Sequence, residues 1–125
     1  MNLLLDTHVL LWWLNNDPIL AEEARDYISD GQNPVFISAA VLWEIRIKQS
    51  IGKLEIPHDF LQVMYKQPFE FLPITIDHAY AVGDLPPIHR DPFDRLLIAQ
   101  AKMENFTIIT RDHLFEKYQV STIRA

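Results

Sequence analysis

Short apolar runs alternate with longer segments of helical period along this chain, and that alternation constrains the fold more than any other feature. Apolar runs of this length are typical of strands, whereas apolar residues spaced three to four apart are typical of helices. Strands that alternate with helices favour an α/β fold with a mainly parallel sheet. The runs are Leu3–Leu5, Pro34–Ile37, Phe69–Ile74 and Phe106–Ile109, and Val120–Ile123 is a candidate for a last strand.

The helical segments lie between these runs. Ser38 ends a strand-like run and precedes Ala39, so it suits the N-cap of a helix that Gly52 would end. No linker or repeat interrupts the pattern, and 125 residues with 49% hydrophobic content suit one compact core, so we predict a single domain over residues 1–125. With boundaries good to about three residues, we expect helices at about 8–15, 19–30, 39–51, 58–66, 76–83, 92–104 and 112–117.

The charge balance is acidic, because 11 basic residues stand against 17 acidic ones and give a net charge of −6. This argues against broad electrostatic adhesion to nucleic acid or to an anionic membrane, so any nucleic-acid contact must be local. The lack of cysteine suits a reducing cytoplasm. Asp6 and His8 interrupt the apolar N-terminal stretch, so we expect no signal peptide, no membrane span and a cytoplasmic location.

Two aspartates stand just after strand-like runs. Asp6 follows Leu3–Leu5, and Asp112 follows the run that leads to Thr110. The carboxyl ends of parallel strands meet at one edge of a sheet, where the ligand sites of open α/β proteins gather. Each aspartate is equally suited to cap the helix that follows it, so position alone leaves both roles open.

Glu44 lies in the predicted helix 39–51, on one stripe with Ala40, Ile47 and Ile51, where its carboxylate would face the core. A buried carboxylate without a partner costs several kcal/mol or takes up a proton. The partner is either a basic side chain turned inward, such as Arg46 or Lys48, or a bound cation. The helix alone leaves these two alternatives open.

Two further aspartates precede an apolar helix. Pro92 suits the first helical position, which makes Asp91 the natural N-cap and Asp94 the third helical residue, on nearly the same face. We assign Asp94 as a ligand and Asp91 as a cap, with a ligand role for Asp91 as a further candidate. Acids that met without a cation would repel one another, and oxygen-only ligands select hard ions such as Mg²⁺ or Mn²⁺.

Four segments, taken in order, resemble the motifs of PIN domains and, more narrowly, those of VapC-like toxins of type II toxin-antitoxin systems. They are Leu3–Thr7, Trp43–Ile45, Asp91–Ala101 and Thr110–Asp112. The resemblance spans nearly the whole chain, and 91–101 together with Ser50–Leu54 is its most specific part. His8 departs from the pattern, because many relatives carry Ser or Asn there, so no role is carried over to that position.

The resemblance implies a three-layer α/β/α sandwich and a metal-dependent endoribonuclease. It implies Mg²⁺ or Mn²⁺ as the cofactor, an RNA substrate, a small antitoxin partner and a homodimer. Trp12, Trp13, Trp43 and Ile51 also favour the dimer, because they offer more large apolar surface than one small core holds. The catalytic and metal-binding acids carried over are Asp6, Glu44, Asp94 and Asp112, with Asp91 as the further candidate and Thr7 and Thr110 as polar support.

Basic residues flank the acidic motifs and are candidates for contacts to RNA phosphates, although ordinary solvated charge explains them equally. A catalytically silent PIN-like module that binds protein or RNA is the main alternative function. An aspartyl-phosphate enzyme also places an aspartate after a strand, but His8 stands where the second acid of Asp-x-Asp would be. Glycines at only 31, 52 and 83 exclude a Gly-x-Gly-x-x-Gly phosphate loop. The basic candidates are Arg46, Lys48, Arg90, Arg95 and Arg111.

Overall fold

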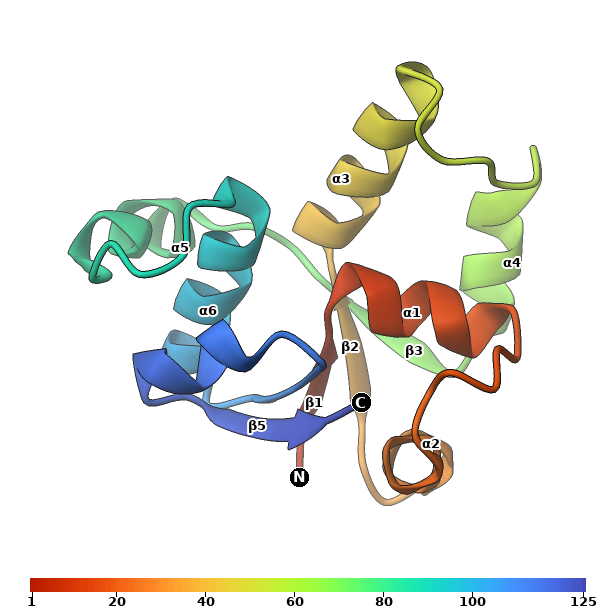
Figure 1. Cartoon of the computed structure of the whole chain (residues 1–125), viewed down its shortest axis with the longest axis horizontal. Helices are drawn as coiled ribbons and strands as arrows, with labels where there is room; N and C mark the ends of the chain where they lie inside the picture. Colours follow the sequence, from red (N-terminus) through yellow and green to blue (C-terminus); the bar gives the residue numbers. More distant parts are fainter.

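A computed structural model describes all 125 residues and contains one five-stranded sheet (Figure 1). The strands lie in the order β3-β2-β1-β4-β5, and every neighbouring pair is parallel. The predicted mainly parallel sheet is therefore confirmed. The strands are β1 (Leu3–Leu5), β2 (Val35–Ser38), β3 (Phe69–Leu72), β4 (Thr107–Thr110) and β5 (Ser121–Arg124).

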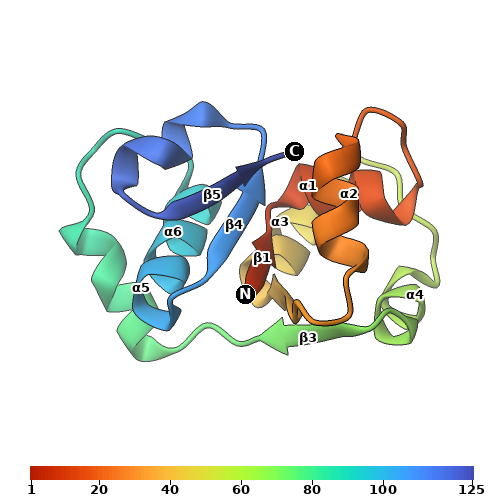
Figure 2. The same ribbon diagram turned by 90° about the horizontal axis from the view of Figure 1, so that it is seen from below.

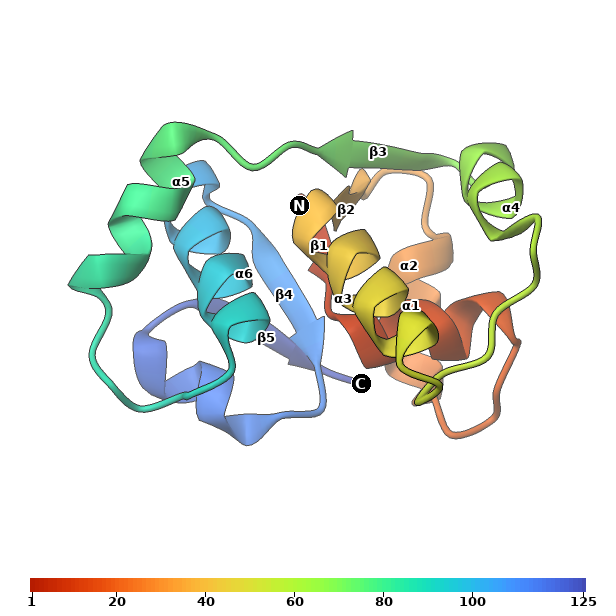
Figure 3. The ribbon, with the colours of Figure 1, turned by 90° about the horizontal axis from the view of Figure 1, so that it is seen from above.

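Helices cover both faces of this sheet. Figures 1 and 3 show α1, α2, α3 and α4 on one side and α5 and α6 on the other, so the predicted three-layer α/β/α sandwich is confirmed. The segment expected as a helix at 112–117 is a short 3-10 helix instead. The helices are α1 (Thr7–Leu14), α2 (Glu22–Ser29), α3 (Ala39–Ser50), α4 (Phe60–Lys66), α5 (Ile76–Ala81) and α6 (Pro92–Glu104), with the 3-10 helices η1 (Val82–Asp84) and η2 (His113–Tyr118).

The helix boundaries follow from local capping. The Ser38 hydroxyl accepts the Ala40 N–H at 3.0 Å and caps α3, as the sequence predicted. Gly52 has φ of +75° just beyond the end of α3, a conformation that glycine adopts without steric cost. The Lys53 N–H then returns to the Lys48 carbonyl at 2.9 Å, which satisfies a carbonyl of the last turn.

One hydrophobic core of 25 buried residues fills the space between the layers, and all three leucines of β1 are fully buried in it. The predicted buried stripe of α3 needs a correction. Ala40, Ile45 and Glu44 are buried, but Ile51 is 59% exposed and Ile47 is also exposed, because α3 turns its second half away from the sheet. No helix of the structure has the length and apolarity needed to cross a membrane.

The topology creates a switch point between β1 and β4. From β1 the chain adds β2 and then β3 in one direction, and after β3 it crosses through α5 and α6 to return as β4 on the other side of β1 (Figure 2). Connections that leave neighbouring strands in opposite directions open a crevice at the carboxyl ends of those strands. Asp6 follows β1 and Asp112 follows β4, so both lie at this crevice.

Candidate active site

The four predicted acids come from four elements that meet at the carboxyl edge of the sheet. Asp6 follows β1, Asp112 follows β4, Asp94 lies in the first turn of α6 and Glu44 lies in the second turn of α3. Helix α6 begins at this edge because it runs antiparallel to the strands before it leads into β4 (Figure 3).

Asp6 is both a helix cap and a buried acid. Its Oδ1 accepts the Val9 N–H at 2.9 Å, which caps α1, and its Oδ2 accepts the Thr110 hydroxyl at 2.5 Å. Burial raises the pKa of Asp6 above its usual value and outweighs the lowering effect of these two hydrogen bonds. The two roles that the sequence left open are thus compatible, because capping uses one oxygen and the other lies against β4.

Glu44 is buried and has two partners. The Thr7 hydroxyl donates to its Oε1 at 2.5 Å, and the Lys48 ammonium lies 2.7 Å from its Oε2. Of the two alternatives for the partner of Glu44, the structure therefore contains the basic side chain. The hydrogen bond to Glu44 raises the pKa of Lys48 further, which keeps the ammonium charged. Because the Lys48 side chain is 39% exposed, it has room to leave Glu44 when another cation arrives.

Asp91 and Asp94 have different roles, and Asp91 is the helix cap that the sequence predicted. The Asp91 Oδ1 accepts the N–H groups of Phe93 at 2.8 Å and Asp94 at 3.1 Å, so Asp91 caps α6. The pKa of Asp94 is raised to about 7, first by burial and then by repulsion from Asp91. Asp6 and Glu44 raise it further, while His89 opposes the rise. Asp94 thus lies within electrostatic reach of the other acids.

Asp112 is held from three sides. Its backbone N–H donates to the Thr110 hydroxyl oxygen at 3.0 Å, its Oδ1 accepts the Leu114 N–H at 3.0 Å, and its Oδ2 lies 2.8 Å from the His89 Nε2. Burial acts to raise the pKa of Asp112, but the Leu114 N–H and His89 outweigh burial and leave the pKa below its usual value. Thr110 therefore links two acids, because its hydroxyl also donates to Asp6.

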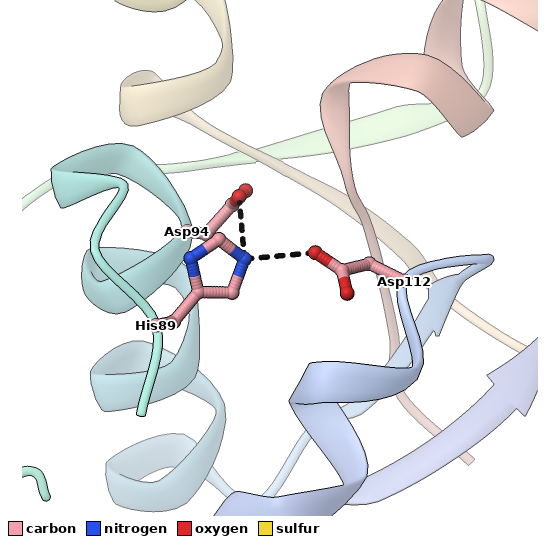
Figure 4. A group of neighbouring side chains, drawn as sticks. All are labelled: His89, Asp94 and Asp112. Carbon is pink, nitrogen blue, oxygen red and sulfur yellow. Dashed lines mark hydrogen bonds and ion pairs between the residues drawn. The ribbon is translucent and has the colours of Figure 1, made fainter. Parts of the chain in front are cut away.

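His89 also lies among the acids, and the sequence did not predict it as a site residue. Its Nε2 lies 2.8 Å from the Asp112 Oδ2 and 3.1 Å from the Asp94 Oδ2 (Figure 4). Each of these three residues has one nitrogen or oxygen atom that could bind a metal, and these three atoms lie within 4.8 Å of one another. Asp6 and Glu44 are outside this group. No local sequence pattern indicates this position, because the loop that carries His89 is placed by Tyr118, whose hydroxyl accepts the His89 N–H.

The side chains fit a hard divalent cation. The site supplies carboxylate oxygens from several elements, and repulsion among them adds to burial in raising the pKa of Asp94. A divalent cation would relieve that repulsion, and carboxylate oxygens are the ligands that Mg²⁺ and Mn²⁺ prefer. Asp94 and Asp112 are the best placed to bind one together, with Asp6 and Glu44 beside them.

The basic residues near the acids have different roles. Arg111 donates to the carbonyls of Ala125 and Ile19 and packs over the Trp12 ring at 4.6 Å, so it is a structural residue. Arg95 is also structural rather than a phosphate contact, because its guanidinium is used by backbone acceptors. These acceptors are the carbonyls of Val82, Leu85, Pro86 and His89. Lys48 at the rim and exposed Arg46 and Arg90 remain as candidates for phosphate contacts.

A sequence model of the PIN domain matches residues 3–120 of this chain. A search of curated proteins finds no relative. Among solved structures, VapBC2 from Rickettsia felis, bound to a DNA fragment from its promoter, is similar over 99% of this chain and 98% of its own, with 17% identity and a TM-score of 0.75.

Two other solved structures show the same likeness. A VapBC-5 structure from Mycobacterium tuberculosis, of the VapBC family of toxin-antitoxin systems, is 22% identical over 99% of this chain and 98% of its own, with a TM-score of 0.62. The PIN domain endonuclease Utp24 is 15% identical over 99% of this chain and 84% of its own, with a TM-score of 0.59. At these identities the likeness concerns the fold.

Proposed function

The chain belongs to the PIN-domain family, and from that premise we propose that it is a metal-dependent endoribonuclease and the toxin of a type II toxin-antitoxin pair. The observation that carries the proposal is that Asp6, Glu44, Asp94 and Asp112 lie at one crevice. The raised pKa of Asp94 indicates that its ionised form is unfavourable there, because of burial and the neighbouring acids. An acidic cluster at a strand-end crevice is suited to hold Mg²⁺ or Mn²⁺.

In this mechanism the four acids would bind the cation, and neighbouring side chains orient the acids through hydrogen bonds. Thr7 donates to Glu44, and Thr110 donates to Asp6, so both carboxylates keep one oxygen fixed. When bound, the cation supplies the positive charge that neutralises the scissile phosphate and activates water for its attack on phosphorus. No side chain is needed as a covalent nucleophile, and the products are 5′-phosphate and 3′-hydroxyl ends.

Lys48 has a further part in the proposal. Its ammonium lies 2.7 Å from Glu44, and its partly exposed side chain would be free to contact an RNA phosphate if a bound cation neutralised Glu44 instead. A local positive group of this kind reconciles an anionic substrate with a chain of net charge −6.

Protein partners of this chain are proposed from the similar structures and from its exposed apolar residues. Two of the similar structures are VapBC proteins, which supports an antitoxin as the partner here. Trp43, Ile47 and Ile51 form one exposed apolar stripe on α3, which supports a protein contact on that face. Trp12 and Trp13 are partly buried and pack against the core, so they offer less exposed surface for a dimer than the sequence suggested. The homodimer and the cytoplasmic location stay predictions.

One observation favours the alternative of a silent PIN-like binding module. The Lys48 ammonium already satisfies Glu44, as expected of a protein that has no use for a metal at that position. The two functions differ in whether RNA is cut and in whether the acids matter for it.

The test is cleavage of an end-labelled structured RNA by the purified protein in Mg²⁺ or Mn²⁺. We expect cleavage that EDTA stops, and its loss in Asp6→Asn, Glu44→Gln, Asp94→Asn and Asp112→Asn. Asp91→Asn is the matched control, because asparagine caps a helix as well as aspartate does. Equal loss in Asp91→Asn would overturn the assignment of Asp94, and not Asp91, as the metal ligand, and metal-independent cleavage or none at all would overturn the enzyme proposal.

A further inference from the structure

The backbone around His89 is anchored independently of the acids. Its N–H donates to the Tyr118 hydroxyl at 2.5 Å, and its carbonyl accepts the Arg95 guanidinium at 3.2 Å. The Phe115 ring meets the imidazole edge-on, with the ring centroids 5.7 Å apart. A replacement of the side chain would therefore leave the two backbone anchors in place.

The hydrogen bonds of the ring define which nitrogen carries the proton. The Asp91 backbone N–H lies 3.2 Å from the His89 Nδ1, and a backbone N–H can only donate, so Nδ1 is the acceptor. In the neutral imidazole the proton is then on Nε2. This Nε2–H donates to the Asp112 Oδ2 at 2.8 Å, and the Asp94 Oδ2 lies 3.1 Å from the same nitrogen (Figure 4).

We infer that His89 is a positioning residue of the metal site, whose Nε2–H donates to Asp112 and lies against Asp94 so that the two carboxylates stay side by side, and that its ring is not a metal ligand. The inference rests on the proposed function, because it assumes that these carboxylates bind the cation. Asp94 comes from α6 and Asp112 from the turn after β4. His89 donates to Asp112 and lies 3.1 Å from the Asp94 Oδ2, so its ring stands between the two carboxylates.

The tautomer separates this role from direct ligation. A histidine that binds a metal through one nitrogen normally donates the proton of its other nitrogen to a carboxylate, carbonyl or water. The His89 Nδ1 instead accepts the Asp91 N–H, so Nε2 has no lone pair to offer. All the metal ligands are therefore oxygen atoms, and such a site prefers Mg²⁺ or Mn²⁺ to zinc.

The first test is the tautomer of His89, read from ¹⁵N-histidine NMR spectra at about pH 8, with and without saturating Mg²⁺. The His89 signals are assigned by their absence in His89→Gln. We expect a protonated Nε2 and an unprotonated Nδ1 in both states. A lone pair on Nε2 in the Mg²⁺-bound protein would show direct ligation and would overturn the inference.

The second test is the Kd for Mn²⁺ by calorimetry. Loss of a side chain that orients metal ligands typically weakens metal affinity about 10- to 100-fold, so His89→Ala should raise Kd by that factor. His89→Gln should recover much of the affinity, because its amide nitrogen can occupy nearly the position of Nε2 and still donates. His58→Ala is the matched control, because His58 is exposed and lies outside the acidic group, and it should bind like the parent.

Each outcome has a different meaning. An unchanged Kd in His89→Ala, or equal weakening in His89→Gln and His89→Ala, would overturn the positioning role while leaving the enzyme proposal intact. An unchanged Kd in Asp94→Asn would show that the carboxylates do not bind the cation, and would overturn the proposed function together with this inference.

Discussion

Replacement of Asp94 by asparagine should stabilise the metal-free protein at neutral pH. Burial and the neighbouring acids raise the folded-state pKa of Asp94 to about 7, from the value of 3.8 expected in the unfolded chain. Between these values the folded protein holds a proton that the unfolded chain has already released. Stability is therefore lost as pH rises from about 4 to about 7, and above pH 7 the full cost of the ionised group remains.

The magnitude follows from the pKa difference. The shift from 3.8 to about 7 is about three pKa units, which at 1.36 kcal/mol each is about 4 kcal/mol. The Asp94 side chain is 22% exposed, and solvent screens part of this cost, so we expect about 2–3 kcal/mol. The asparagine side chain carries no charge, so the variant lacks this cost at every pH.

The assay is urea unfolding in EDTA at pH 4.5 and pH 8. The difference in the free energy of unfolding between Asp94→Asn and the parent should grow by about 2 kcal/mol from pH 4.5 to pH 8, because part of the cost is already present at pH 4.5. Asp59→Asn removes the same charge from an exposed position whose side chain makes no cap bond, so its difference should stay near zero. A difference for Asp94→Asn that is flat across this range would refute the burial and repulsion that we assign to the Asp94 carboxylate.

Three other replacements have distinct outcomes. Lys48→Met should lower the Kd for Mn²⁺ in calorimetry, because it removes the cation that competes for Glu44, and should raise KM for RNA. Thr110→Val should destabilise the protein by about 1–3 kcal/mol in urea unfolding, because Asp6 and the Asp112 N–H both lose a partner, and Thr110→Ser should restore most of it. Arg95→Lys should lower the melting temperature by several degrees, because one ammonium cannot replace a guanidinium that serves four backbone carbonyls.

Local patterns were sufficient to predict most of the architecture. The alternation of apolar runs and helical segments led to the strands and to the mainly parallel sheet, because strands and helices have different periodicities. The three layers were implied by the PIN-domain resemblance. Capping residues were also predicted correctly, since Ser38 and Asp91 cap their helices through bonds to N–H groups two or three residues away. The positions of Asp6 and Asp112 followed from the geometry that parallel strands share.

Features that depend on contacts distant in the sequence were missed or wrong. His89 reaches Asp112 because Tyr118, 29 residues later, accepts its N–H and Arg95 binds its carbonyl. Arg95 was a candidate for RNA phosphates, but the carbonyls that it binds lie in a loop whose path no periodicity describes. Ile51 was placed on a buried stripe with Glu44, yet helical spacing does not reveal where a helix leaves the sheet.

The most direct test of the metal site is an anomalous difference map from crystals soaked in Mn²⁺ and measured near the manganese absorption edge. We expect a peak bonded to the carboxylate oxygens of Asp94 and Asp112, beside Asp6 and Glu44, that disappears in crystals of Asp94→Asn. Absence of a peak at the acids, or an equal peak in Asp94→Asn, would contradict the claim that these carboxylates form the metal site of a nuclease.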